Sequence, residues 1–448
     1  MGRIADTIAR FVRLAFWPLC VSVLVVLLLQ PIYFLALGSL GTLAPREHTI
    51  EHLRAAFAQG VIAADGSPRS LLWKGGEQVA ECISVGIGLN KAESAWQTAI
   101  SGDYPMVGDT HACTGLYHAV NGEPTSWQPY FRYWHGYRVI LAPFVALFPF
   151  WFVKLLNALM VAAACTAFWV TLRNRAGVAV ATITLATFVF LSNVLFIWRT
   201  STHSISLAYI LAGACMFAAA LARDWRAGRL IVLAAALGSV FNFVDFLINP
   251  PMMPMLLGFF VLLDDRRRDV GLLALACIVA WFGGDAETWI ARWAIAYAAL
   301  PHGAEVMNNV LFSIQERSLG AAQSVYLWPL AATVRTYLRA LDRVGVIVPI
   351  IIAMAIAHYS ATVSRINWRR ALRLATPLLA TVLWFEALSS QTQYHLTVSA
   401  RSAAMAMAIA LAATVISMPR RPSLPELWAQ LQILRAKVPR LRQRRGDP

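Results

Sequence analysis

The feature that most constrains this chain is its series of long apolar runs. A transmembrane helix needs about 20 consecutive apolar residues. With 58% hydrophobic and 14% charged residues, the 448-residue chain is too apolar for a soluble protein. We therefore predict an all-α polytopic membrane protein with about ten transmembrane helices, or roughly 10–12 because two runs are short. The predicted spans are residues 17–38, 152–172, 177–197, 204–222, 230–248, 251–263, 270–284, 344–360, 374–391 and 402–418.

Basic residues between the spans indicate the orientation, because positive segments resist translocation. Most of them fall on one side, in the N-terminal stretch, four connectors and the tail 419–448. That side is predicted to be cytoplasmic, with both termini on it. Topology and anionic membrane lipids then explain the formal net charge of +15, so we expect no nucleic acid as a partner.

Two segments, residues 39–137 and 285–343, are too long to be simple connectors, and the orientation places both on the outer face. Within the second, residues 286–300 and 327–341 are expected to form amphipathic helices at the outer interface.

Arg335 and Arg339 stand four residues apart in the second of these helices and would share one face. They suit lipid phosphates or a polyprenyl phosphate, and snorkelling to headgroups is the alternative. Cys82 and Cys113 share an outer segment, where a disulfide is open to them if that face is oxidising.

Ionisable groups near membrane depth are costly unless they are paired or functional. Those of this chain gather near the outer face, whereas unrelated structural charges would be spread over both faces. They are Glu77, Glu81, Arg199, His203, Asp245, Asp285, Glu287, Glu386, His395 and Arg401. For Asp245, capping of backbone groups near Asn249 and Pro250 is the structural alternative.

Glu77 and Glu81 are the strongest candidates for chemistry. They are four residues apart among apolar neighbours, so on a helix both carboxylates would project from one side. A carboxylate in such a place suits a general base acting on an acceptor hydroxyl. The alternative is an ion pair with Lys74 or Arg138.

One span, a long outer segment with acidic residues, and then many spans is an arrangement that resembles the GT-C superfamily of integral-membrane glycosyltransferases. The motif Tyr133-Trp134-His135-Gly136-Tyr137 before Pro143 is similar to a signal that those enzymes carry ahead of their second span. Further similar segments are Phe243-Val244-Asp245-Phe246-Leu247 with Pro250, Trp281-Phe282-Gly283-Gly284 with Trp289 and Arg292-Trp293, and Tyr394-His395 with Arg401.

The resemblance implies a transmembrane catalytic domain over residues 1–418 in the bacterial inner membrane, with a periplasmic active site. It implies glycosyl transfer from a polyprenyl-phosphate-linked sugar donor to a glycan, lipid or protein acceptor, in contact with membrane lipids. The chain lacks the large C-terminal periplasmic domain of several branches. The family base is commonly aspartate, whereas residues 77 and 81 are both glutamate.

By the same resemblance, Glu81 is the expected base and Glu77 would position the acceptor or a metal. Arg401, Arg199 or His395 would bind the departing phosphate, on which negative charge grows in the transition state. Arg335 and Arg339 are further candidates for this role. Supporting roles fall to His135, His203, Asp245 and Glu386. No cofactor is certain, and dependence on a divalent metal stays open.

Other classes compete with this hypothesis. A lipid-linked-sugar flippase should show charges along a path through the membrane. A secondary transporter should show broken helices paired across two halves. A membrane acyltransferase would need a buried histidine near the middle of the membrane. The gathering of charges at one face favours the glycosyltransferase.

Overall fold

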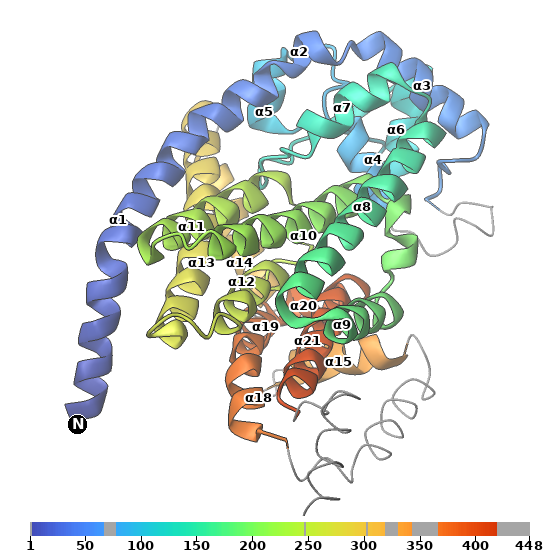
Figure 1. Cartoon of the computed structure of the whole chain (residues 1–448). Coiled ribbons are helices and arrows are strands. Elements are labelled where there is room, and N and C mark those ends of the chain that lie inside the picture. The colour runs from blue at the N-terminus through green and yellow to red at the C-terminus, as the bar shows by residue number, and fades with distance from the viewer. Residues whose placement is uncertain are drawn as a thin grey trace, which may run out of the picture.

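The computed structural model describes residues 2–66, 78–245, 248–301, 303–318, 330–342 and 366–418, and these are mostly helical (Figure 1). Six helices are long and apolar enough to cross a membrane. They are α1 (Gly2–Gly38), α8 (Phe150–Ala176), α10 (Ser201–Ala222), α11 (Ala227–Val244), α13 (Val270–Ala299) and α21 (Leu396–Ile416). The predicted span 344–360, the tail 419–448 and Glu77 lie outside the described residues.

Two of the predicted spans form short apolar helices. The run 177–197 gives α9 (Val178–Leu191), which ends where Ser192 adopts an extended conformation before the 3-10 turn η1 (Val194–Arg199). The run 251–263 gives α12 (Met252–Leu262), which begins only after Pro250 and Pro251.

A third run, residues 374–391, is not one helix. It divides into the end of α18 (Trp368–Ala375), η2 (Thr376–Leu378), α19 (Leu379–Ala387) and α20 (Ser389–Tyr394). Pro377 lacks a backbone N–H for the helical ladder, and Leu388 departs from helical geometry with φ −114° and ψ 53°. The prediction of a single span was therefore wrong there.

Helix α13 corrects another expectation. Residues 286–300 do not form a separate interfacial helix, because α13 runs without a break from Val270 to Ala299. Of its three glycines, Gly271, Gly283 and Gly284, the last lies where α11 approaches closely and needs a small residue. A Cβ on Gly284 would lie 2.1 Å from the carbonyl oxygen of Ala235, and one on Gly238 would lie 2.1 Å from that of Trp281.

The long segment after α1 folds into a cap, defined as residues 39–66 and 78–137, at one end of the helices (Figure 1). The Cys82–Cys113 disulfide, a pairing that the sequence left open, joins two of its helices, α4 and α6. The cap contains α2 (Leu40–Leu43), α3 (Arg46–Ala58), α4 (Gln78–Gly86), α5 (Ala95–Ser101), α6 (Ala112–Asn121) and the antiparallel pair β1 (Tyr104–Met106) and β2 (Ser126–Gln128), and α7 (Arg138–Leu147) follows it.

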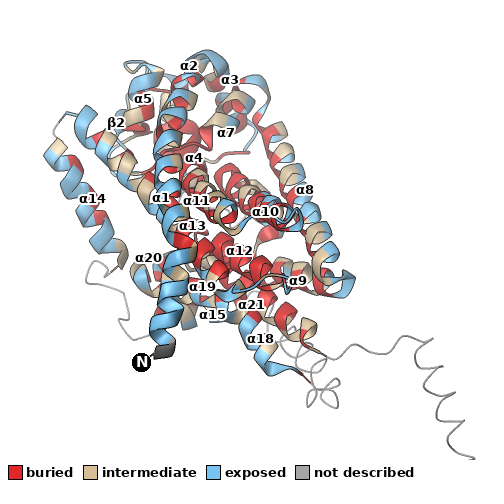
Figure 2. Cartoon of the chain, turned by 60° about the vertical axis from the view of Figure 1, so that its left-hand side comes forward, coloured by how far each residue is buried: buried red, intermediate tan, exposed pale blue. Residues whose placement is uncertain are grey.

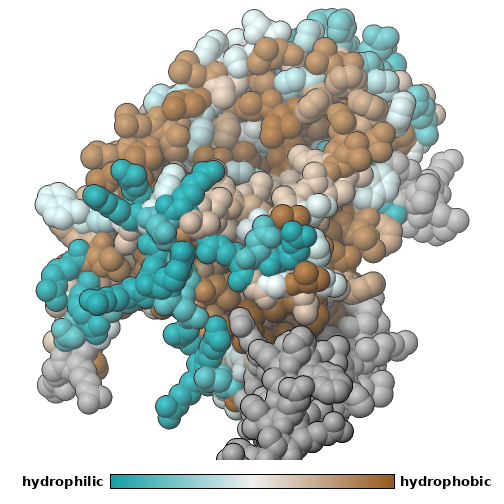
Figure 3. Space-filling view, viewed as in Figure 1, coloured by the Kyte–Doolittle hydropathy of each residue, from teal (hydrophilic) through white to brown (hydrophobic). Residues whose placement is uncertain are grey.

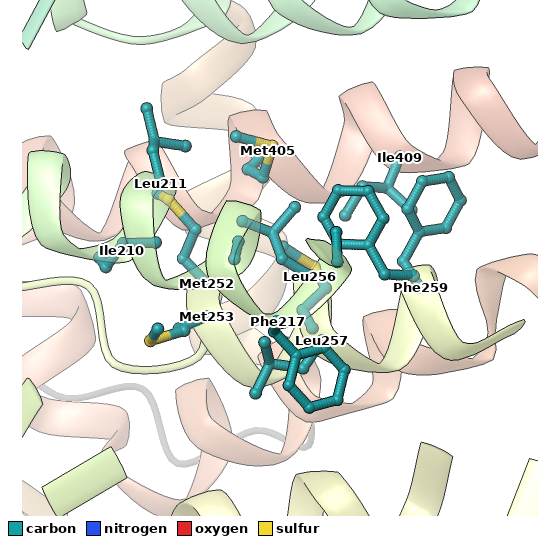
Figure 4. Close-up of a cluster of buried hydrophobic side chains, with 14 of the residues drawn as sticks. Ile210, Leu211, Phe217, Met252, Met253, Leu256, Leu257, Phe259, Met405 and Ile409 are labelled. Carbon is teal, nitrogen blue, oxygen red and sulfur yellow. The ribbon is translucent and has the colours of Figure 1, made fainter. Parts of the chain in front are cut away.

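The interior lies between α10, α11, α12 and α21, which are largely buried in Figure 2, whereas α1 is exposed along much of its length. Every residue of α12 is buried, so this short helix packs against neighbours on all sides. Figure 4 shows its Met252 beside Leu211, its Leu256 near Met405 and its Phe259 beside Ile409.

The end away from the cap is rich in ion pairs, and we call it the basic end (residues 223–229, 264–269 and 369–373, with the start of α1). Asp265 accepts from Arg370 and Arg373 at 3.0 and 2.8 Å, and Arg10 contacts Asp269 at 2.9 Å. Figure 3 shows hydrophilic side chains gathered over this end and hydrophobic ones between it and the cap.

Two further helices lie beside the bundle. They are α14 (Gly303–Ser318) and α15 (Ala331–Asp342), and the second matches the amphipathic helix predicted over 327–341. Phe312 is 61% exposed on α14 and Leu338 is 59% exposed on α15, so both helices present apolar side chains outward.

Candidate functional site

A cavity of about 660 Å³ lies where the cap meets α14 and the short helices before α21. The cap contributes Val79, Ala80 and Ile83 of α4 together with Tyr130, Arg132 and Tyr133. The rest of the wall comes from His203, Ile248, Pro250, Pro251, Glu316, Arg317, Trp384, Phe385, Ser390, Gln391, Thr392, Tyr394, His395, Val398, Ser399 and Ser402. Parts of the chain more than 300 residues apart therefore share one space.

Two arginines that the sequence interpretation missed stand on this wall. Arg132 donates to the Ser313 hydroxyl at 2.9 Å and lies 5.0 Å from the ring centroid of Tyr130. Arg317 donates to the Tyr133 hydroxyl at 2.6 Å and lies over the ring of Tyr133. The partners described for both guanidinium groups are thus hydroxyls and aromatic rings. Arg132 is next to the recognised motif 133–137, which was the available signal.

Two histidines also stand on the cavity wall. His203 and His395 both line it. Arg401 lies behind His203, with its Nη2 3.2 Å from the His203 Nδ1, and its Nε donates to the Asn193 Oδ1. Arg401 is 2% exposed and is not itself a lining residue. Arg401 thus contacts His203, which lines the cavity together with His395.

Glu81 lies one layer behind the wall. Lys154 of α8 donates to its Oε1, and Ser201 of α10 donates from its hydroxyl to Oε1 at 2.7 Å and from its backbone N–H to Oε2 at 2.6 Å. Lys154 and Glu81 are each 3% exposed. An ion pair was the alternative for Glu81; its described partner is Lys154 instead of Arg138, and Lys74 lies outside the described residues.

Asp245 caps a backbone N–H group, which was the structural alternative to a functional role for this residue. Its Oδ2 accepts from the backbone N–H of Ile248 at 2.7 Å, and its Oδ1 accepts from the Ser206 hydroxyl. Because Ile248 lines the cavity, Asp245 holds part of the wall in place.

The other predicted residues lie off the cavity wall. Arg199 stands over the ring of Phe196 at 4.6 Å. Arg335 donates to the Gln393 Oε1 at 2.8 Å, whereas Arg339 of the same helix is exposed. Glu386 accepts from the backbone N–H and hydroxyl of Thr333 at 2.9 and 2.7 Å, which ties α15 to α19.

His135 organises the approach to the cavity. It has a φ of 59°, and its ring nitrogens lie 2.7 Å from the Tyr130 carbonyl oxygen and 3.2 Å from the Tyr137 hydroxyl. Burial, followed by the charge of Arg292, lowers the pKa of His135 well below its usual value. A neutral imidazole that makes two hydrogen bonds here shapes the loop that presents Tyr130 and Arg132.

Among the described residues, no group of three or more His, Cys, Asp or Glu side chains is arranged to hold a metal ion. Comparisons with other proteins add no identification: no family model, no curated protein and no solved structure matches this chain.

Proposed function

We propose that this protein is a membrane glycosyltransferase that takes its sugar from a polyprenyl-phosphate carrier, with the 660 Å³ cavity as its active site. The observation that supports this most is the set of Arg132, Arg317, His203 and His395 on one cavity wall, between the cap and the apolar helices. Phosphate needs cationic donors, and a polyprenyl tail needs an adjoining apolar medium.

The two arginines are the phosphate-binding residues of this proposal. Their described hydrogen bonds are to neutral hydroxyls, so a phosphate can accept from both without displacing a hydrogen-bonded carboxylate. Guanidinium groups bind phosphate through paired hydrogen bonds, which strengthen as charge grows on the leaving group. Arg401 would act through His203, which it orients.

The acceptor needs a base, and among the described residues Glu316 is the carboxylate that lines the cavity. Glu81 has both oxygens engaged by Lys154 and Ser201, so its proposed role is to fix α4 against α8 and α10. The base of the proposal is therefore Glu316, beside the phosphate-binding Arg317.

A lipid-linked-sugar flippase or transporter is the alternative. Such a protein needs charged groups along a route through the membrane. The buried ionisable side chains of the described residues concentrate toward the cap, and Asp264 at the basic end is an exception that pairs with Arg266 and Arg267. This distribution favours chemistry at one end.

The test is binding of a polyprenyl phosphate to the full chain in nanodiscs, compared with the uncharged polyprenol. Arg132→Gln and Arg317→Gln should each weaken binding of the phosphate by about 10- to 100-fold, the value of a hydrogen bond to a charged group. Arg173→Gln, an exposed arginine on α8, is the control. Equal binding of both lipids, or unchanged affinity in both variants, would refute the proposal.

A further inference from the structure

A second cavity, of about 320 Å³, lies on another side of the cap. It is enclosed by the end of the α1 span, the beginning of α3, the end of α4 and the beginning of α7. Its wall includes Leu37 and Leu40 on the apolar side and Arg46, Ser84 and Arg138 on the polar side. None of these residues lines the 660 Å³ cavity.

Arg138 is the unusual member of this wall. It is 7% exposed, and within the described ranges its side chain makes no hydrogen bond or salt bridge, with Nε fully enclosed and lacking an acceptor. Burying a charged group without a partner costs several kcal/mol. Arginine cannot escape that cost by losing its proton.

The guanidinium of Arg138 packs against Gly88, which has a φ of +94°. A Cβ at that position would come within 2.4 Å of the Arg138 Nη2, so the glycine makes room for the charge. Arg46 reaches the same place from α3, donating to the Gly88 and Glu93 carbonyl oxygens at 3.2 and 3.3 Å. Both guanidinium groups therefore lie against Gly88 on the cavity wall.

No salt bridge is described between these two arginines and the nearby carboxylates. The charge of Glu93 acts on Arg138, but the Glu93 carboxylate accepts its hydrogen bonds from the hydroxyls of Thr98 and Ser101, both at 3.1 Å. Glu47 also borders the cavity, but it is exposed, so water screens its charge. The buried Nε of Arg138 thus remains without an acceptor within the described ranges.

We propose that this cavity is a second binding site, for a phosphate-bearing anion whose oxygens accept from Arg138 and Arg46. Because Leu37 and Leu40 at the end of the α1 span form its apolar side, the headgroup of an anionic lipid fits it. Free inorganic phosphate offers the same oxygens. The site is independent of the glycosyl-transfer cavity.

The test is thermal unfolding of the full chain in neutral detergent, with inorganic phosphate, phosphatidylglycerol or phosphatidylcholine added separately. Saturating anion should raise the Tm of the wild type by roughly 2–4 °C, while Arg138→Met should not respond. Without anion, Arg138→Met should melt no lower than the wild type, because it removes an unpaired buried charge. A response to phosphatidylglycerol alone assigns the site to a lipid, and a response to phosphate assigns it to the free anion.

A wild type that responds to neither anion, or an Arg138→Met variant that responds equally, would overturn the proposal. If Arg138→Met does not fold, Arg138→Lys keeps the charge and should require on the order of tenfold more anion for the same shift. Arg132→Gln should respond to the anion like the wild type, and this separates the second site from the proposed donor site. A Tm rise abolished by Arg132→Gln and retained by Arg138→Lys would contradict the assignment.

Discussion

Glu81 and Lys154 form a buried ion pair that connects the cap to the membrane helices, and each side chain is 3% exposed. Ser201 completes the group by donating to both carboxylate oxygens. A residue of α4, one of α8 and one of α10 thereby share a single polar cluster. Since Val79, Ala80 and Ile83 of α4 line the larger cavity, this cluster sets the position of that wall.

The first prediction concerns this pair. Glu81→Gln or Lys154→Met alone should lower the free energy of unfolding by about 3–5 kcal/mol, because each leaves one buried charge uncompensated. The double variant should recover much of that loss. Thermal or denaturant unfolding of the four proteins gives the coupling energy. Additive losses would show that the two charges do not depend on each other.

The second prediction identifies the base. Glu316→Gln should slow glycosyl transfer by about 10² to 10⁴ while binding of polyprenyl phosphate stays near that of the wild type. Glu386→Gln is the matched control, because Glu386 bonds to Thr333 away from the cavity. Full transfer by Glu316→Gln would return the role to the glutamates predicted from sequence, Glu77 and Glu81.

The third prediction concerns Arg401. Arg401→Lys should lower the melting temperature, because a single ammonium cannot reproduce the fork that reaches both Asn193 and His203. Its affinity for polyprenyl phosphate should fall less than that of Arg317→Gln, since Arg401 stands behind the wall. Measuring melting and lipid affinity on the same samples checks both. A stable Arg401→Lys variant that binds no donor would place Arg401 in direct contact with phosphate.

The fourth prediction tests the crossing of α11 and α13. Gly284→Ala should destabilise the protein by about 1–3 kcal/mol, since its Cβ would meet a backbone oxygen that cannot move away cheaply. Gly283→Ala, with nothing within 4 Å of the new Cβ, should be neutral or slightly stabilising because alanine favours a helix. Thermal unfolding of the two neighbouring variants makes the comparison, and equal melting would contradict the observed crossing.

The fifth prediction is a pH dependence in the cap. Burial, followed by the charge of Glu93, raises the pKa of Asp103 from 3.8 to about 6. The folded protein therefore holds a proton there that the unfolded chain has released, and stability at this site falls as pH rises from about 4 to 6. Asp103→Asn should remove that decline, so its advantage in Tm should grow between pH 4.5 and about 7. A constant difference across that range would argue against the raised pKa.

The apolar runs determined most of the helices. Long, strongly apolar stretches predict α1, α8, α10, α11, α13 and α21 because lipid leaves a spanning backbone few alternatives to a helix. Hydropathy did not show that α12 is a short helix, or that residues 374–391 are divided among several helices. Hydropathy reports that a run is buried, but it does not distinguish burial in lipid from burial in protein.

The sequence also led to His203, His395 and Arg401, since charged groups beside spans are rare enough to stand out. It did not reveal Lys154 as the partner of Glu81, 73 positions away. Nor did it distinguish Arg132 and Arg317 from other arginines, or identify Arg138 as a buried charge. Whether a charge is paired, buried or facing a cavity depends on which distant segments pack around it. That is a property of tertiary contacts, because local spacing along a helix fixes only which side chains share a face.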